Sequence, residues 1–200
     1  MTYKDTLEDF CKGRVVAKFG DDVVHDSSNV ITYRAADIMA RVISGDGNYI
    51  PTHIGFIYGP TAATMQNPDG ASPVRQHTLQ DIADDVEAIG GNMLVSPIIG
   101  SPLFAVDGDT DYYEGNAVTI TSISDGSSPL AFAGGSFATD RPQATTDKYF
   151  QAALLTRLLA PGSTTPLYKP FARVQLAAGN DGLVVQSGFE LSVFWTITFK

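Results

Sequence analysis

Three aspartates that alternate with other residues form the clearest candidate for chemistry in this sequence: Asp107, Asp109 and Asp111. Carboxylate oxygens at this spacing can ligate Ca²⁺. The calcium-binding loop of helix–loop–helix proteins also needs glycine at its sixth position and glutamate at its twelfth. This chain has Tyr112 and Val118 at those positions. We therefore expect a polar turn here, with a weak calcium site as the alternative.

The histidines, serines and single cysteine do not form a catalytic or metal-binding pattern. His25, His53 and His77 are isolated and lack the spacing of zinc ligands, so we expect His53 to be a hydrogen-bonded structural residue. Ser136 lies in a stretch that differs by one residue from the nucleophile elbow, but no helical pattern follows it. Cys11 is the only cysteine, which excludes an intrachain disulfide. We predict that the protein is not an enzyme and holds no cofactor.

Aromatic residues on the expected strands and turns allow two interpretations. They could line a sugar-binding platform, or they could be core and subunit-contact residues, which is the commoner role of aromatic side chains on strands. We favour the second interpretation and keep a carbohydrate-binding β-sandwich module as an alternative. The residues concerned are Tyr112, Tyr113, Tyr149, Phe150, Tyr168 and Phe171.

The end of the chain alternates between apolar and polar residues, which is the pattern of a strand with one buried face. Apolar side chains, Trp195 among them, occupy the odd positions of residues 189–199, and Phe194 is the only apolar residue at an even position. We expect further strands over residues 53–58, 93–99, 117–123, 149–159 and 168–177. The segment 149–159 also fits helical spacing, and we favour a strand. These elements predict a mainly β fold, an antiparallel β-sandwich or barrel-like sheet with one or two short helices.

The best helical pattern covers residues 35–43, where apolar side chains recur at three- and four-residue intervals. Residues 27–29 could cap its beginning, and Gly45 supplies a left-handed stop. Asp37 and Arg41 lie four positions apart and are expected to form an exposed ion pair. The helix should cover an edge or an end of the sheet.

Composition excludes several classes of function. The chain has 200 residues and a net charge of −9, which argues against a nucleic-acid groove. The acidic residues include the outer face of a second expected helix over residues 79–89, interpreted as a solvated face. Only 18% of residues are charged, which suits a surface covered by other subunits. No targeting segment or membrane span is visible, so we expect a soluble protein made in the cytoplasm.

Two regions are expected from the sequence: an extended arm over residues 1–28 and a single β-rich domain over residues 29–200. A short apolar piece between charged stretches in the arm, residues 15–19, could form one extended strand or reach a neighbouring protein. Deleting residues 1–20 should then weaken binding and leave the fold intact. The residues predicted to form the interface are Arg14, Val15, Val16 and Phe19.

Residues 29–46 and 50–59 resemble an opening seen in virion proteins of tailed bacteriophages, in which an amphipathic helix ends at Gly-Asp and a strand ending in glycine follows. Residues 190–199 resemble the closing strand of such proteins, and residues 92–96 and 149–155 fit more loosely. The matching motifs are patterns of packing residues.

This resemblance implies a structural protein of the virion, made in the host cytoplasm. Among virion proteins we expect a head decoration (cement) protein that binds the major capsid protein or other virion proteins from outside. It would act as a homo-oligomer, with a trimer favoured because shells offer threefold axes, and would bind no nucleic acid and no membrane. A tail or baseplate location is the alternative within the virion.

Overall fold

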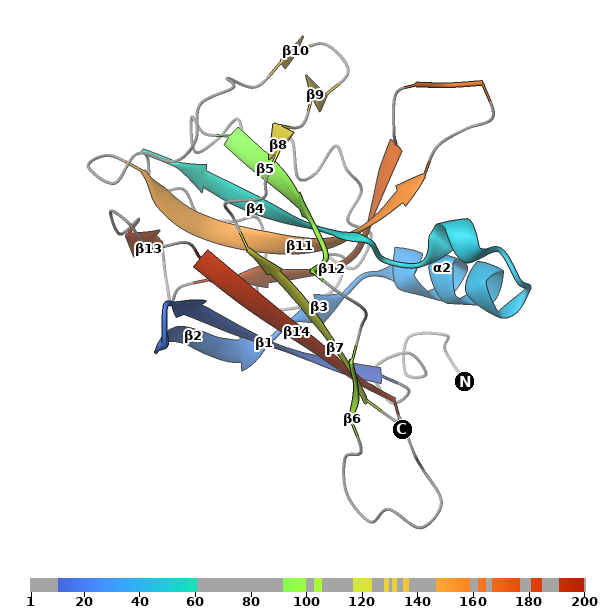
Figure 1. The fold of residues 1–200 in the computed structure, drawn as a ribbon, viewed down its shortest axis with the longest axis horizontal. Helices are drawn as coiled ribbons and strands as arrows, with labels where there is room; N and C mark the ends of the chain where they lie inside the picture. Colours follow the sequence, from blue (N-terminus) through green and yellow to red (C-terminus); the bar gives the residue numbers. More distant parts are fainter. Residues whose placement is uncertain are drawn as a thin grey trace.

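The computed structural model describes residues 11–60, 92–99, 103–105, 117–123, 128–129, 131–132, 135–136, 147–158, 162–164, 167–176, 181–184 and 191–199, and every structural statement below concerns these residues. They form two main antiparallel sheets, a separate two-stranded pair and one α-helix (Figure 1). The prediction of a mainly β, antiparallel fold is confirmed, and the stacked sheets are consistent with a sandwich. The separate pair consists of β9 (Ala131–Phe132) and β10 (Gly135–Ser136).

The five-stranded sheet is built around the end of the chain. Its strands lie in the order β2–β1–β14–β7–β6, so β14 is central. On β14, Val193, Trp195 and Ile197 are buried, which confirms the alternation in the sequence. The bounds are β1 (Cys11–Phe19), β2 (Asp22–Ser28), β6 (Leu103–Ala105), β7 (Ala117–Ile123) and β14 (Leu191–Phe199).

Residues 11–28 belong to this sheet and do not form the extended arm that we expected. β1 pairs with β14 from Cys11 opposite Phe199 to Phe19 opposite Leu191, and with β2 on its other side. Its inward-facing side chains at Val15 and Phe19 are 0% and 3% exposed. The partner strand lies at the opposite end of the sequence, so no local pattern could reveal the pairing. Residues 1–10 lie outside the described part.

The seven-stranded sheet contains the strand whose assignment was ambiguous. β11 (Lys148–Leu158) pairs with β12 on one side and β4 on the other, so residues 148–158 form a central strand. The path runs β3–β12–β11–β4–β5–β8, and β13 pairs with β11. The other bounds are β3 (Val30–Ile31), β4 (His53–Gly59), β5 (Asn92–Pro97), β8 (Ser128–Pro129), β12 (Leu167–Gln175) and β13 (Leu183–Val184).

The core lies between the two sheets. One cluster of buried side chains contains Trp195 from the five-stranded sheet and Ile54, Phe56 and Leu154 from the seven-stranded sheet. Each such side chain contributes about 1.5–3 kcal/mol when buried. On the opposite face of the seven-stranded sheet, Ile57, Met93 and Leu155 are also 0% exposed. The seven-stranded sheet is therefore buried on both faces.

Helix α2 (Tyr33–Ile43) covers one end of the seven-stranded sheet and leads into the short 3-10 helix η1 (Gly47–Tyr49) (Figure 1). Gly45 has a φ of 91°, so the predicted left-handed stop is confirmed. The predicted cap at residues 27–29 is wrong, because β2 continues to Ser28 and Thr32 precedes the helix. The Thr32 hydroxyl donates a hydrogen bond to the carbonyl of Pro170 at 2.8 Å, so it ties the start of the helix to β12.

Candidate interaction surfaces

The five-stranded sheet has an outer face that points away from the core. On β1, Lys12, Arg14, Val16 and Lys18 alternate with the buried residues and so lie on this face. Lys12 and Arg14 are exposed, and Val16 and Lys18 are partly exposed. Three cations therefore lie on one face of a single strand, in a chain with 13 lysines and arginines in all.

A pair of apolar side chains lies at the centre of the outer face. Val16 on β1 is directly opposite Phe194 on β14, and both are partly exposed. The Lys18 ammonium lies 5.4 Å from the centroid of the Phe194 ring, within the range of a cation–π interaction. The remaining outward-facing residues of β14 are Ser192, Thr196 and Thr198. The outer face thus has an apolar, aromatic centre among hydroxyl groups and cations.

Only one of the three cations on β1 is paired with a carboxylate. Arg14 donates two hydrogen bonds to Asp26 on β2, at 2.8 and 2.6 Å. This interaction raises the pKa of Arg14 and lowers the pKa of Asp26, chiefly through the hydrogen bond and then through opposite charge. Within the described residues, no carboxylate forms an ion pair with Lys12 or Lys18. Among these residues, Lys12 and Lys18 thus have no carboxylate partner, in contrast to Arg14.

Two of the four residues predicted to form the interface lie on the outer face. Arg14 and Val16 are on it, with 65% of the Arg14 side chain exposed. Val15 and Phe19 are in the core, so the structure contradicts their assignment to an interface. Strand alternation is the reason, since neighbours on β1 must face opposite ways.

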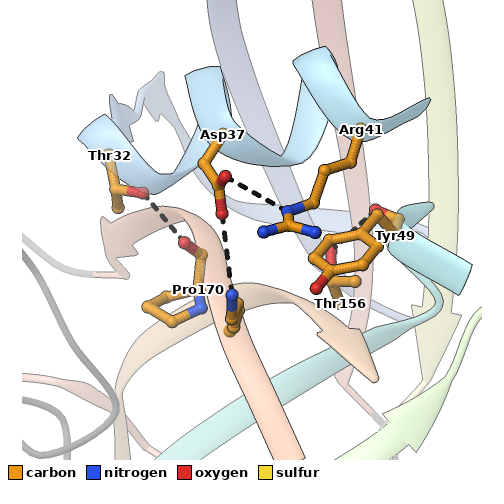
Figure 2. Close-up of polar contacts among 7 residues, drawn as sticks. Thr32, Asp37, Arg41, Tyr49, Thr156 and Pro170 are labelled. Atoms are coloured by element: carbon orange, nitrogen blue, oxygen red, sulfur yellow. Dashed lines mark hydrogen bonds and ion pairs between the residues drawn. The ribbon is translucent and has the colours of Figure 1, made fainter. Parts of the chain in front are cut away.

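A second surface surrounds the end of α2, where one carboxylate joins the helix to the sheet (Figure 2). Asp37 accepts a hydrogen bond from Arg41 at 3.2 Å, which confirms the predicted pair, and lies 3.6 Å from the Lys169 ammonium on β12. The Arg41 and Lys169 cations lie 4.6 and 5.3 Å from the centroid of the Tyr49 ring. The Thr156 hydroxyl on β11 donates a hydrogen bond to the carbonyl of Tyr49 at 3.2 Å. These contacts hold α2, η1 and the sheet together.

Two apolar side chains in the last turn of α2 are not buried. Ala35 and Ile38 are 0% exposed, whereas Val42 and Ile43 at the end of the predicted apolar stripe are exposed. Ile50, directly after η1, is exposed as well. The apolar stripe of the helix is therefore buried at its start and exposed at its end.

His53 is a structural residue in the described part of the chain. Its Nδ1 lies 2.8 Å from the Thr52 hydroxyl, and its ring meets the Tyr168 ring edge-on at 5.6 Å. Burial lowers the pKa of His53, and the charge of Arg157 lowers it further. The imidazole is therefore neutral at physiological pH, as suits a packed, hydrogen-bonded side chain. His25 lies 2.7 Å from the Ser27 hydroxyl and has a pKa lowered by burial.

The aromatic platform is not formed by the described residues that were candidates for it. Tyr149, Phe150 and Phe171 are buried, and only Tyr168 is partly exposed. Tyr149 packs against Phe19, Phe56 and Tyr58 in the core. Three of these four aromatics are thus core residues, and Trp195 is fully buried.

Several predicted features lie outside the described residues. They are the three aspartates of the calcium candidate (Asp107, Asp109 and Asp111), Tyr112, Tyr113, His77 and the helix over residues 79–89. For Cys11 and Ser136 only the backbone is described, in β1 and β10. Among the residues that are described, no cluster of three metal-ligating side chains occurs, and no helix is both long and apolar enough to span a membrane.

Sequence reasoning missed Lys12, Lys18 and Phe194 as residues that lie together on the outer face of the five-stranded sheet. One signal was present: Phe194 is the apolar exception among the polar positions of its strand. No family model, curated protein or solved structure matches this chain. Its function is therefore inferred from these surfaces and from the resemblance of its segments.

Proposed function

We propose that the protein is a non-enzymatic structural component of a tailed-bacteriophage virion, a decoration protein that binds the outside of the head and stabilises contacts between capsid subunits. The observation that carries this proposal is the outer face of the five-stranded sheet. Its centre is apolar and aromatic, and Arg14 lies on the same strand as Val16; aromatic residues and arginine are enriched at protein–protein interfaces, whose rims are polar.

The resemblance to phage virion proteins adds support, because the segments that carry it are central to the fold. Residues 29–46 contain α2, residues 50–59 contain β4, and residues 190–199 contain β14. Ile38, Phe56 and Trp195, one from each segment, belong to the same buried cluster. Residues far apart in the sequence thus form one packed unit.

The proposed role needs a sheet face that a partner can reach, and among the described residues the outer face of the five-stranded sheet is partly exposed. A sandwich with a shared core changes shape little on binding, so the outer face can dock without a large ordering cost. The charge of −9 is tolerable on the exterior of a shell and unsuited to contact with packaged DNA. Docking across adjacent capsid subunits would add contact area at their boundary and oppose their separation.

The direct test is co-sedimentation of the purified protein with assembled, DNA-free heads of the phage that encodes it. We expect saturable binding, and we expect occupied heads to disassemble at a higher temperature than bare heads. Purified tails from the same phage serve as the control. Binding to tails and not to heads would place the protein in the tail or baseplate. Binding to neither particle would reject a virion role.

A carbohydrate-binding module is the rival from another class, and the buried aromatics count against it. Trp195 is 0% exposed, and Tyr149, Phe150 and Phe171 are buried too. Added glycans should therefore leave the fluorescence of Trp195 unchanged. Saturable quenching by a glycan would favour that rival.

A further inference from the structure

We propose that His53, Arg157 and Tyr168 form a binding site for a carboxylate group at one end of the seven-stranded sheet. The three residues come from the neighbouring strands β4, β11 and β12. The site goes beyond the proposed function, because it lies on a different sheet from the surface assigned to docking on the head. Its ligand is either a free small carboxylate or an acidic side chain of a neighbouring protein, and these two sources can be distinguished by experiment.

Strand pairing places the three side chains on one face of the sheet. Arg157 on β11 lies directly opposite Tyr168 on β12, and such a pair shares a face. His53 on β4 lies opposite Leu155, which is two residues from Arg157 and therefore points to the same face. Leu155 is 0% exposed, whereas Arg157 is exposed. His53 and Tyr168 are partly exposed, so the buried part of this face ends at the site.

Thr52 fixes the orientation of the His53 ring. The Thr52 backbone N–H donates a hydrogen bond to the carbonyl of Leu155, and the Thr52 carbonyl accepts one from the N–H of Ile98, both at 3.0 Å. The Thr52 hydroxyl accepts a hydrogen bond from the backbone N–H of Arg157 at 3.4 Å and lies 2.8 Å from Nδ1 of His53. The hydroxyl proton is then available to Nδ1, an arrangement that leaves the imidazole proton on Nε2.

The donors of the site have no acceptor among the described residues. Nε2 of His53 donates to none of them, and it is not one of the buried polar atoms that lack a partner, so it is open to solvent. No described carboxylate forms an ion pair with Arg157. Burial raises the pKa of Tyr168 more than the charge and hydrogen bond of Arg157 lower it, so the hydroxyl keeps its proton. The site therefore presents three kinds of donor to an external acceptor.

Charge and shape favour a carboxylate as that acceptor. Arg157 is the only charged group in the described part of the chain that shifts the pKa values of His53 and Tyr168. Because the imidazole is neutral, the site carries one positive charge, which matches the single negative charge of a carboxylate. A guanidinium binds a carboxylate through two parallel hydrogen bonds, and the neutral donors can reach its remaining lone pairs. A phosphate dianion carries more charge than this site can balance.

The test follows the ring nitrogens of His53 by NMR in the full chain, with sodium acetate replacing sodium chloride at constant ionic strength. We expect a saturable shift of Nε2 with a dissociation constant in about the millimolar range, and no saturable shift at His25 on β2. The absence of a saturable shift at His53 would overturn the proposal, as would a ring proton on Nδ1 in the free protein. Binding of inorganic phosphate as tight as that of acetate would overturn the assignment to a carboxylate.

Matched variants separate the site from a general effect of charge. Arg157→Gln and Lys148→Gln each remove one positive charge from β11, but Lys148 lies at the opposite end of this strand, about 30 Å away. Arg157→Gln should weaken acetate binding by at least about tenfold, and Lys148→Gln should leave it unchanged. Tyr168→Phe removes one hydroxyl and should weaken binding by about three- to tenfold. Equal effects of the two glutamine variants would contradict the proposal. Thermal unfolding verifies the fold of each variant.

Two further measurements identify the source of the carboxylate. Lactate, succinate or citrate that binds at least about a hundredfold more tightly than acetate would identify a free ligand. An acidic side chain of a neighbouring protein gains affinity from the rest of that protein instead. In that case Arg157→Gln should weaken co-sedimentation with heads, and Lys148→Gln should not.

The two proposals fail in different ways. Acetate binding at His53 by a protein that binds neither heads nor tails would support the carboxylate site and reject the virion role. Saturable binding to heads without any response of His53 to carboxylates would reject the site and leave the decoration role standing.

Discussion

Asp37 illustrates how a single exposed carboxylate positions a helix. It lies 3.2 Å from Arg41 on its own helix and 3.6 Å from Lys169 on β12. Partial desolvation acts to raise the pKa of Asp37, but the hydrogen bond from Arg41 and the charges of both cations outweigh it, and the pKa is lowered. Asp37 is therefore more easily ionised in the folded protein than in the unfolded chain, and its ionised form favours folding.

We expect Asp37→Asn to lower the free energy of unfolding at neutral pH by up to about 1 kcal/mol, the range for exposed ion pairs. A lowered pKa contributes stability that is present above the unfolded value and lost as the pH falls through the folded value. The difference between wild type and variant should therefore shrink below about pH 4. Urea unfolding at a series of pH values measures this difference in the free energy of unfolding.

The control, Asp181→Asn, removes an exposed carboxylate that forms no ion pair among the described residues. A difference that persists undiminished in acid would show that the charge of Asp37 is not responsible.

At the residue scale, the sequence predicted the ion pair of α2 and the structural role of His53, but only half of the surface on β1. Val15, Val16 and Ala17 are all apolar, so the alternation that separates Val16 from its buried neighbours is not visible in the sequence. Spacing within a helix is local and can be read directly, as for Asp37 and Arg41. The contact of Asp37 with Lys169 joins residues far apart in the chain and could not be predicted.

At the scale of the element, α2 buries only part of its apolar stripe. Ile38 is fully buried and Ile43 is 81% exposed, although both belong to the same stripe. Ile38→Ala should lower the free energy of unfolding by about 2–5 kcal/mol, because it leaves a cavity in the core. Ile43→Ala is the matched control and should change it by less than about 0.5 kcal/mol. Urea denaturation of both variants tests this. A large loss at Ile43 would mean that the end of the helix is packed in solution.

Strands and helices with a strong periodicity of apolar residues could be predicted from the sequence, but the pairing between strands could not. Residues 117–123 form β7 as predicted, and the alternating end of the chain forms β14. The start of α2 was misplaced because Ser27 and Ser28 are good capping residues by type, yet they belong to β2. Capping preference is a local signal, and pairing with β1 overrides it. The same limitation hid the partner of β1, which is the last strand.

At the scale of the whole molecule, the two ends of the described chain complete one sheet. β1 and β14 pair over nine residues each and lie side by side in the centre of the five-stranded sheet (Figure 1). Val15 lies directly opposite Trp195, and both are 0% exposed. Folding of this sheet therefore requires a contact between distant parts of the sequence, and the core depends on residues that we had expected to be an arm.

This arrangement changes the expected result of the deletion of residues 1–20. The sequence predicted weaker binding with an intact fold, whereas the structure predicts loss of folding. The deletion removes the buried side chains of Val15, Ala17 and Phe19 and leaves β14 without one of its partners. Burial of Val15 and Phe19 alone contributes about 1.5–3 kcal/mol each. Domains are stable by only about 5–15 kcal/mol in total, so the truncated chain should not stay folded.

Deleting residues 1–10 is the matched control, because it leaves every pairing of β1 in place. We expect that variant to unfold cooperatively on heating and to keep the blue-shifted fluorescence of a buried Trp195. The longer deletion should give no cooperative transition and red-shifted emission, since β1 no longer covers the core beside Trp195.

If both deletions unfold alike, residues 1–10 are themselves needed for stability. A cooperative transition with native emission after the longer deletion would show that β1 is dispensable. Residues 11–20 would then be free to act as the arm that the sequence suggested.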